Sequence, residues 1–220
     1  MYEFDIATIA RHFALIPQAL WVTLYLTFIT IAVSTLLGIL GALGRTSNIR
    51  LLRAMLTAYT EFLRNIPLLV LIYLVFFGLP QLGLRFDGTW SVLIALGANA
   101  TAYMIEVFRS GLLSIPSGQY HAAEAQGMRY HQVQLFVILP QVIRNVYESY
   151  GNICVGILLG SSLASVVSVN DLSHWMFQTG SDTFRYMETF LVCAGIYVVL
   201  AQLITGLRAL LRRHLFASIP

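Results

Sequence analysis

Long apolar runs separated by short polar stretches dominate the pattern of this chain. A helix that crosses a bilayer needs about 20 mostly apolar residues. Five runs reach that length, at about residues 18–43, 55–79, 90–108, 140–167 and 187–210. The pattern predicts an all-α integral membrane protein with five transmembrane helices, organised as one domain over residues 1–220.

Composition supports a membrane protein and argues against a soluble one. The chain is 58% hydrophobic and only 10% charged, with a mean hydropathy of +0.76. Soluble domains carry about 25% charged residues, so this chain has too little charge to cover a water-facing surface. The excess apolar surface is expected to contact membrane lipid.

The formal net charge is +3, and every basic side chain other than histidine is an arginine. The arginines are scattered between apolar runs, which disfavours nucleic-acid binding and instead suggests a topology signal. Eight of them flank the spans on one side: Arg45, Arg50, Arg53, Arg109, Arg129, Arg208, Arg212 and Arg213. Because basic residues accumulate on the cytoplasmic side, we expect the N-terminus outside and the C-terminus in the cytoplasm.

A polar island rich in small residues lies between the third and fourth spans, at about residues 109–132. Pro116 suits the first turn of a helix, and Ser117 or Gly118 can cap that helix. Residues 120–126 then form about two turns, which Gly127 ends by adopting a positive φ. The helix presents small side chains, so it is either a contact surface for a partner or an ordinary interfacial helix.

The run from Gly118 to Met128 (GQYHAAEAQGM), followed by Leu139-Pro140-Gln141, resembles the cytoplasmic "EAA" loop of ABC importer permeases. Three further groups of residues make the chain similar to permeases for polar amino acids. They are the stretch at residues 64–69 (RNIPLL), Ala102-Tyr103 with Glu106, Arg109 and Gly111, and Arg144, Asn152 and Ser162-Leu163. The resemblance runs from about Thr23 to the C-terminus.

The resemblance implies a type I importer permease in a bacterial inner membrane. Its coupling region, about residues 115–131, would dock on a separate ATPase subunit, with Ala122, Ala123 and Gly127 as the core and Glu124 and Arg129 at the margin. The implied partners are two ATP-binding subunits that hold ATP and magnesium, a second permease subunit and an external solute-binding protein.

Two positions depart from the family pattern. His121 replaces the usual Glu, and Gln126 replaces the usual Leu. The departures favour a heterodimer whose other permease subunit carries the fuller motif, although a homodimer with altered contacts stays open.

Charged residues inside a span are candidates for function. Arg64 can pair with Glu61 three residues earlier, or it can face a cavity and attract a carboxylate. Glu148 can pair with Arg144 four residues earlier, or it can face a cavity and meet an amino group.

The fourth span carries small and polar residues that form either a substrate wall or a tight helix-packing surface. The candidates for the cavity, besides Arg64 and Glu148, are Asn152, Gly156, Gly160, Ser161 and Ser162. Relatives that move cationic amino acids carry acids at positions that correspond here to Ile153 and Gly160. The absence of acids there favours a neutral or acidic substrate such as glutamine, glutamate or aspartate.

Other functional classes are less well supported. A phosphate-binding loop of the Gly-x-x-x-x-Gly-Lys type is absent, so the chain itself is not expected to be an ATPase or to bind a cofactor. The alternative is a stand-alone carrier or channel, which predicts inverted repeats or paired broken helices. Cys154 and Cys193 lie in apolar runs and are expected to be buried thiols, and no metal site is expected. Residues 170–177 predict a short outer helix capped by Asp171 or Ser173.

Overall fold

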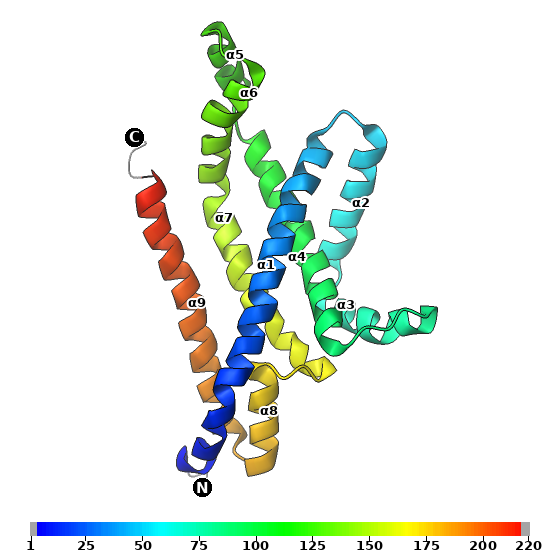
Figure 1. Cartoon of the computed structure of the whole chain (residues 1–220), viewed down its shortest axis with the longest axis vertical. Helices are drawn as coiled ribbons and strands as arrows, with labels where there is room; N and C mark the ends of the chain where they lie inside the picture. Colours follow the sequence, from blue (N-terminus) through cyan, green and yellow to red (C-terminus); the bar gives the residue numbers. More distant parts are fainter. Residues whose placement is uncertain (1–3, 217–220) are drawn as a thin grey trace.

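The computed structural model describes residues 4–216, and every regular element in that range is helical (Figure 1). Four long helices run along the molecule. Three of them are α1 (Ile16–Thr46), α4 (Gly88–Leu113) and the continuous helix of residues 130–167, and the fourth is α9. α9 spans Tyr186–Phe216. Together with a bent helix pair that counts as one further span, these helices can make five membrane crossings, as the sequence predicts.

α1 and α4 approach each other closely because glycines line the contact. A Cβ placed on Gly38 would lie 2.4 Å from the Cβ of Met104, and one on Gly41 would lie 2.5 Å from Ile105 Cδ1. Small residues of this kind allow helix backbones to approach in a membrane, where packing rather than the hydrophobic effect drives helix association. α1 and α4 therefore form the central pair of the bundle.

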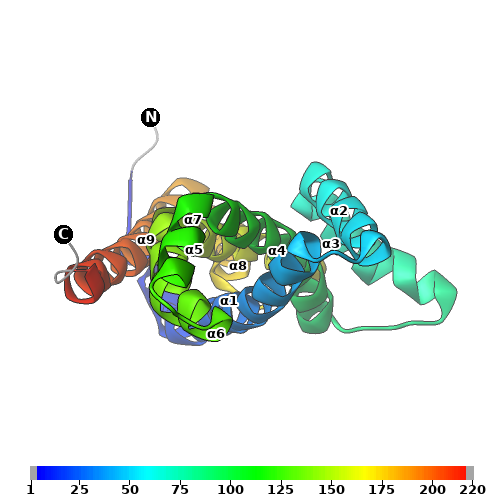
Figure 2. The same ribbon diagram turned by 90° about the horizontal axis from the view of Figure 1, so that it is seen from above.

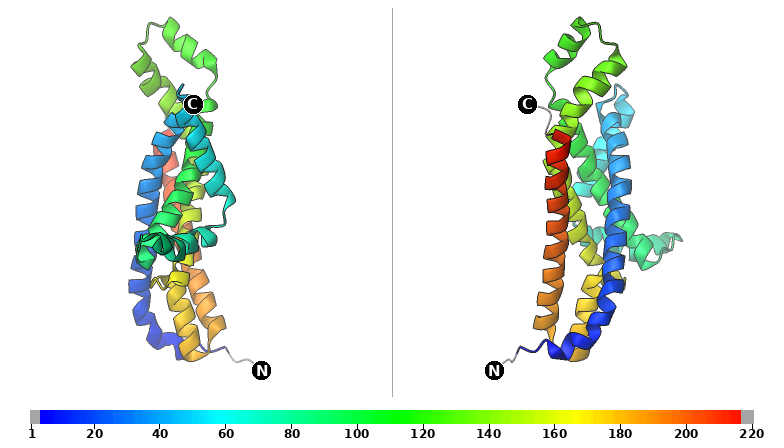
Figure 3. Two further views of the ribbon diagram at one scale, coloured as in Figure 1. Left: turned by 90° about the vertical axis from the view of Figure 1, so that its right-hand side faces the viewer. Right: turned by 60° about the vertical axis from the view of Figure 1, so that its left-hand side comes forward.

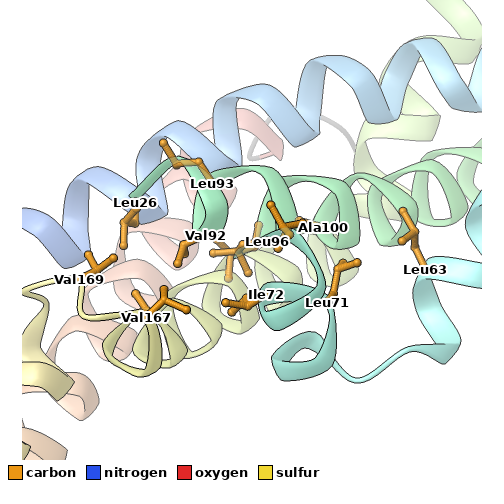
Figure 4. Close-up of a cluster of buried hydrophobic side chains, with 14 of the residues drawn as sticks. Leu26, Leu63, Leu71, Ile72, Val92, Leu93, Leu96, Ala100, Val167 and Val169 are labelled. Atoms are coloured by element: carbon orange, nitrogen blue, oxygen red, sulfur yellow. The ribbon is translucent and has the colours of Figure 1, made fainter. Parts of the chain in front are cut away.

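The main core gathers around α4 (Figure 4). Val92 and Leu96 of α4 pack with Leu71 and Ile72 of the short helix α3 (Leu68–Tyr73). Val167 closes the core from η5, the 3₁₀ segment Ser161–Val167 at the end of the fourth span. One helix thus contacts most of the elements that surround the centre of the bundle.

The second span is broken, which corrects the prediction of one continuous helix over residues 55–79. α2 (Arg50–Asn65) ends before Pro67, and the helices that follow, over residues 68–82, are bent away from it by 107°. Pro67 has no N–H group, and its ring excludes the helical conformation for Ile66, which is extended at φ −95° and ψ 131°. After α3, the π-helix η2 (Leu74–Gly78) and the 3₁₀ segment η3 (Leu79–Leu82) project from the side of the bundle (Figure 2).

The fourth span is longer than predicted, because its helix does not begin at Pro140. It starts with α6 (Tyr130–Gln132) and the π-helix η4 (Val133–Ile138) and continues through α7 (Leu139–Gly160) into η5. Pro140 cannot donate a backbone hydrogen bond within the helix, and the wider turns of η4 precede it directly. A proline here changes the local winding without ending the rod.

The two ends of the bundle carry different short helices (Figure 3). α5 (Ser117–Ala125) lies at one end, where α9 also finishes. The 3₁₀ segment η1 (Ala7–Leu15) and α8 (Leu172–Thr183) lie at the other end. Trp175 of α8 joins them, because its Nε1 donates a hydrogen bond of 2.9 Å to the carbonyl oxygen of His12.

Replacing Gly38 by alanine should destabilise the bundle by about 1–3 kcal/mol, because the new methyl group overlaps Met104 and forces α1 and α4 apart. Thermal unfolding of the full chain in detergent measures the effect. Gly97→Ala is the matched control, since Gly97 lies in α4, the other helix of this contact, and a Cβ there meets nothing within 4 Å. Equal melting temperatures for the two variants would contradict the close α1–α4 contact.

Candidate functional site

The polar island forms the short helix α5, as predicted. Pro116 takes the N-cap position in place of Ser117 or Gly118, and no side chain caps the helix, so the prediction of a cap at these residues is wrong. Gly127 ends it with φ +78°, and its N–H donates to the carbonyl oxygen of Glu124 at 2.9 Å. Met128 N–H bonds back to Ala123 at 3.2 Å. This termination fixes the direction in which the chain returns to the fourth span.

The two faces of α5 have different environments. Ala123 is only 4% exposed and packs in a cluster with Ile115, Val133 and Ile138 of the same chain. Ala122, Glu124, Gly127 and Arg129 are exposed. This corrects the expectation that Ala123 belongs to an outward docking surface, because its side chain holds α5 to its own bundle.

α5 is connected to both neighbouring spans. Asn145 Nδ2 of α7 donates a hydrogen bond of 2.7 Å to Ser114 Oγ, just after α4. One turn further into the bundle, α4 and α7 meet at Gly111, where an added Cβ would lie 2.2 Å from Val146 Cγ1. The ends of α4 and α7 on either side of α5 are therefore joined to each other.

A cluster of charges at the same end joins three helices. Arg45 Nη1 of α1 lies 2.5 Å from Glu106 Oε2 of α4 and donates at 3.2 Å to Thr60 Oγ1 of α2. Arg109 pairs with the other oxygen of Glu106. From the sequence, Arg45 is interpreted as a topology signal, and Arg109 as a topology signal and, with Glu106, as part of the family resemblance. The signal that could have revealed the cluster is Glu106, a carboxylate one turn before Arg109.

A cavity of about 340 Å³ lies between α3, α4 and α7, next to the break in the second span. Its polar lining comes from Asn99, Tyr103 and Asn152, and Gly156 lies on the same wall as Asn152. Asn99 Nδ2 donates at 2.8 Å to the carbonyl oxygen of Leu63, so it also completes the hydrogen bonding at the end of α2. Two of the predicted wall residues, Asn152 and Gly156, thus line this cavity.

Three other predicted wall residues lie beyond this cavity. Gly160 packs closely, since a Cβ there would be 3.1 Å from Leu68 Cδ2 and 3.3 Å from Leu96 Cδ1. Ser161 and Ser162 donate to carbonyl oxygens of their own helix, at 2.7 and 2.6 Å. Gly160 therefore serves helix packing, and none of the three residues lines the cavity.

Arg64 borders the cavity without entering the predicted ion pair. Its guanidinium carbon lies 5.3 Å from the ring centre of Tyr103, and among residues 4–216 the arginine makes no ion pair with Glu61. An arginine over a tyrosine face is stabilised by the ring quadrupole. Because Tyr103 lines the cavity, this contact places a positive charge beside it.

Glu148 does not pair with Arg144, which corrects the second ion-pair prediction. Its carboxylate lies 2.7 Å from Arg212 Nη1 and 3.3 Å from Arg208 Nη1, both on α9. Glu148 also lies outside the cavity that Asn152 lines. The local spacing of four residues suggested the wrong partner, since the true partners follow about 60 residues later in the sequence.

At the opposite end, Asp171 caps α8 as predicted, its carboxylate accepting from His174 N–H at 2.8 Å. The N–H of the next residue, Leu172, donates to Thr23 Oγ1 of α1 at 3.1 Å. Asp171 is fully buried, and this burial raises the pKa of its carboxyl group from 3.8 to about 6. The cap therefore titrates in a mildly acidic range.

Comparison with known proteins agrees with this geometry. The model of the family "Binding-protein-dependent transport system inner membrane component" matches residues 34–216. A probable glutamine ABC transporter permease protein of Bacillus subtilis, GlnM, is 34% identical over 89% of this chain and 91% of its own length. The arginine transport system permease protein ArtQ of the same species is 30% identical over 91% of this chain and 92% of its own length.

Solved structures show the same fold. An amino acid ABC transporter crystallised with histidines superposes with a TM-score of 0.89 at 31% identity, covering 97% of this chain and all of the other. The inward-facing MetNI methionine ABC transporter superposes with a TM-score of 0.76 at 20% identity, covering 94% of this chain and 98% of the other. At this identity the similarity concerns the fold alone.

Asp171→Asn should remove a pH dependence from the stability of the protein. The raised pKa means that the folded state binds a proton more tightly, so wild-type stability falls as pH rises from about 4 to about 6, by about 3 kcal/mol in total. Asparagine caps a helix equally well and does not ionise. Melting temperatures across this range should drop for the wild type more than for the variant, and parallel profiles would contradict the buried titration.

Proposed function

The chain belongs to the family of inner membrane components of binding-protein-dependent transport systems, and we propose that it imports polar amino acids. It is a multi-pass permease subunit of a type I ABC importer and a transport component rather than an enzyme, working with an ATPase and a binding protein. In the proposed assembly, two ATP-binding subunits hold ATP and magnesium, and an external solute-binding protein delivers the substrate.

The arrangement of α5 is the observation that carries the proposal. One face is buried against its own bundle, and the other exposes Ala122, Glu124 and Gly127 for a partner. α4 and α7, to which α5 is attached, also line the cavity beside the broken span. A partner that moves α5 would therefore reshape the cavity, as an ATP-driven importer requires.

The lining of the cavity favours a neutral or acidic amino acid over a cationic one. Its polar groups are two amides and a phenol, Asn99, Asn152 and Tyr103, and its lining contains no carboxylate. Arg64 adds a positive charge next to Tyr103. Named relatives include permeases for glutamine, arginine and octopine, and this lining points to glutamine, glutamate or aspartate as substrates.

Orientation and partner choice complete the proposal. The end of the bundle with α5 and the end of α9 faces the cytoplasm, because Arg45, Arg50 and Arg53 lie at this end. The N-terminal end with η1 and α8 faces outward. The exposed His121 and Gln126 alter the docking surface, which favours a heterodimer with a second, unlike permease subunit.

Gly127→Asp should abolish coupling to the ATPase while leaving insertion into the membrane intact. Asp tolerates a positive φ, so the main change is a negative charge on the exposed side of α5. The measurement is ATP-dependent amino-acid uptake by the complete transporter in vesicles. Gly127→Asn is the neutral control at the same position, and Asn48→Asp adds the same charge in the exposed loop before α2.

Two results would overturn the proposal. Undiminished uptake by the Gly127→Asp transporter would refute the docking role of α5. Uptake by the wild type that continues at full rate without ATP hydrolysis would instead indicate a stand-alone carrier or channel.

Gly156→Asp should shift selectivity towards cationic amino acids if the cavity holds the substrate. Gly156 lines the cavity, and a Cβ there meets nothing within 4 Å, so the new carboxylate fits without displacing a neighbour. Competition of uptake by a panel of amino acids measures the shift, with Gly156→Asn as the uncharged control. Identical selectivity in the two variants would place the substrate elsewhere.

A further inference from the structure

A second, larger hollow lies between α7 and α9 near the end of the bundle that carries α5. Its volume is about 820 Å³, and four arginines line it, Arg144 on α7 and Arg208, Arg212 and Arg213 on α9. Glu148 is the only acidic residue among its lining. This basic crevice, defined by the four arginines and Glu148, does not share its lining with the cavity beside α3.

The inner wall of the basic crevice is fixed by packing and hydrogen bonds. Gly151 makes room for Arg208, because a Cβ on Gly151 would lie 2.3 Å from Arg208 Cδ and 2.7 Å from its Nη1. Arg208 Nη1 donates to Asn152 Oδ1 at 3.1 Å and to the backbone oxygen of Glu148 at 3.2 Å. Arg208 is thus held in place between the two helices.

The positive charge of the crevice exceeds what its one carboxylate neutralises. Glu148 is engaged by Arg208 and Arg212. Among residues 4–213, whose side chains the structure describes, Arg144 and Arg213 make no ion pair or side-chain hydrogen bond. Two guanidinium groups therefore line the hollow without a partner among the described side chains.

Measured along α9 from its first residue, the crevice comes at the depth expected for phospholipid headgroups. Arg208 follows Tyr186, the first residue of α9, by 22 positions, which is about 33 Å along the helix. The hydrocarbon core of a bilayer is about 30 Å thick, so the arginines that begin at Arg208 fall just beyond it. A guanidinium at this level can meet a lipid phosphate without entering the apolar region.

The surface next to the crevice is suited to acyl chains. On α9, Leu203, Leu207 and Leu210 are between 57% and 63% exposed. Leu203 and Leu207 precede Arg208 on the membrane side, and Leu210 lies between Arg208 and Arg212. Few residues of the apolar part of α9 are buried, so the helix is open laterally. An anion bound among the arginines would have a continuous apolar surface beside it.

We propose that the basic crevice between α7 and α9 binds the phosphate group of an anionic phospholipid. Arg144 and Arg213 supply the free donors, Arg212 and Arg208 add positive charge, and the leucines of α9 receive the acyl chains. Arginine pairs well with phosphate because its planar donors match the phosphate oxygens. Basic pockets between transmembrane helices at this level are known to suit anionic headgroups. The bound lipid would join α7 to α9 beside the Glu148 ion pairs.

Native mass spectrometry of the detergent-solubilised full chain tests this proposal, with phosphatidylglycerol or phosphatidylcholine titrated into the sample. We expect the wild type to retain phosphatidylglycerol preferentially. Arg144→Gln combined with Arg213→Gln should weaken that binding on the order of tenfold, because each arginine near a lipid phosphate contributes a factor of several. These two arginines are chosen because neither pairs with a side chain that the structure describes.

The matched control combines Arg50→Gln with Arg53→Gln, which removes the same charge from exposed positions of α2 at the same end of the bundle. It should bind phosphatidylglycerol as the wild type does. Equal losses in both double variants would mean general surface attraction and would refute the site. Equal binding of the two lipids by the wild type would refute it as well.

Two competitors distinguish the source of the anion. Inorganic phosphate or glutamate is added at increasing concentration to the wild-type complex with phosphatidylglycerol. Retention of the lipid supports a headgroup site that needs the acyl chains. Full displacement by phosphate would assign the crevice to free anions, and full displacement by glutamate would assign it to the transport path, and either result overturns the lipid proposal.

Discussion

The bundle depends on one constraint, which is that backbone polar groups at membrane depth must find partners inside the protein. Pro67 breaks the second span and leaves carbonyl oxygens at the end of α2 without helical donors. Asn99 of α4 donates to the oxygen of Leu63, and the Tyr103 hydroxyl lies 3.4 Å from that of Arg64. The same two side chains also line the cavity. The residues that satisfy the carbonyl oxygens at the break are therefore the residues that make the cavity polar.

This constraint makes α4 the element through which the two ends of the proposed mechanism communicate. Its middle supplies the cavity lining and the core around Val92 and Leu96, and its end leads directly into α5. Glycines hold its neighbours close, at Gly38 towards Met104 and at Gly111 towards Val146. Closely packed interfaces of this kind shift between discrete arrangements rather than deforming gradually.

Features encoded within a few neighbouring residues were predictable from the sequence. Apolar length located the spans, and the positive φ of Gly127 and the Asp171 cap followed from local chemistry. The break at Pro67 was also encoded locally, but the apolar run on both sides concealed it. The hydropathy of a run indicates that the segment can lie in lipid, but it does not indicate where the helix axis bends.

Contacts between distant residues were not predictable in the same way. Helical spacing suggested Arg144 as the partner of Glu148, but the partners in the fold are Arg208 and Arg212. It also suggested Glu61 as the partner of Arg64, whereas Arg64 lies over the ring of Tyr103. The composition of α5 could not reveal that Ala123 is buried while Ala122 is exposed. That difference depends on where Val133 and Ile138 place the following helix.

The two arginine–glutamate clusters at the α5 end show why burial, rather than residue type, decides what an ion pair does. Arg45 and Glu106 have side chains only 13% and 25% exposed, so separating them would leave a poorly solvated charge between α1 and α4. Arg212 and Glu148 are 64% and 53% exposed, and pairs this open contribute only about 0.2–1 kcal/mol. The first cluster therefore holds helices together, whereas the second can exchange partners at little cost. An anion entering the basic crevice competes with Glu148 for Arg212, which water already solvates, whereas Arg208 is only 21% exposed and is held by Asn152. The adjustable part of the bundle is therefore the end of α9 beyond Arg208.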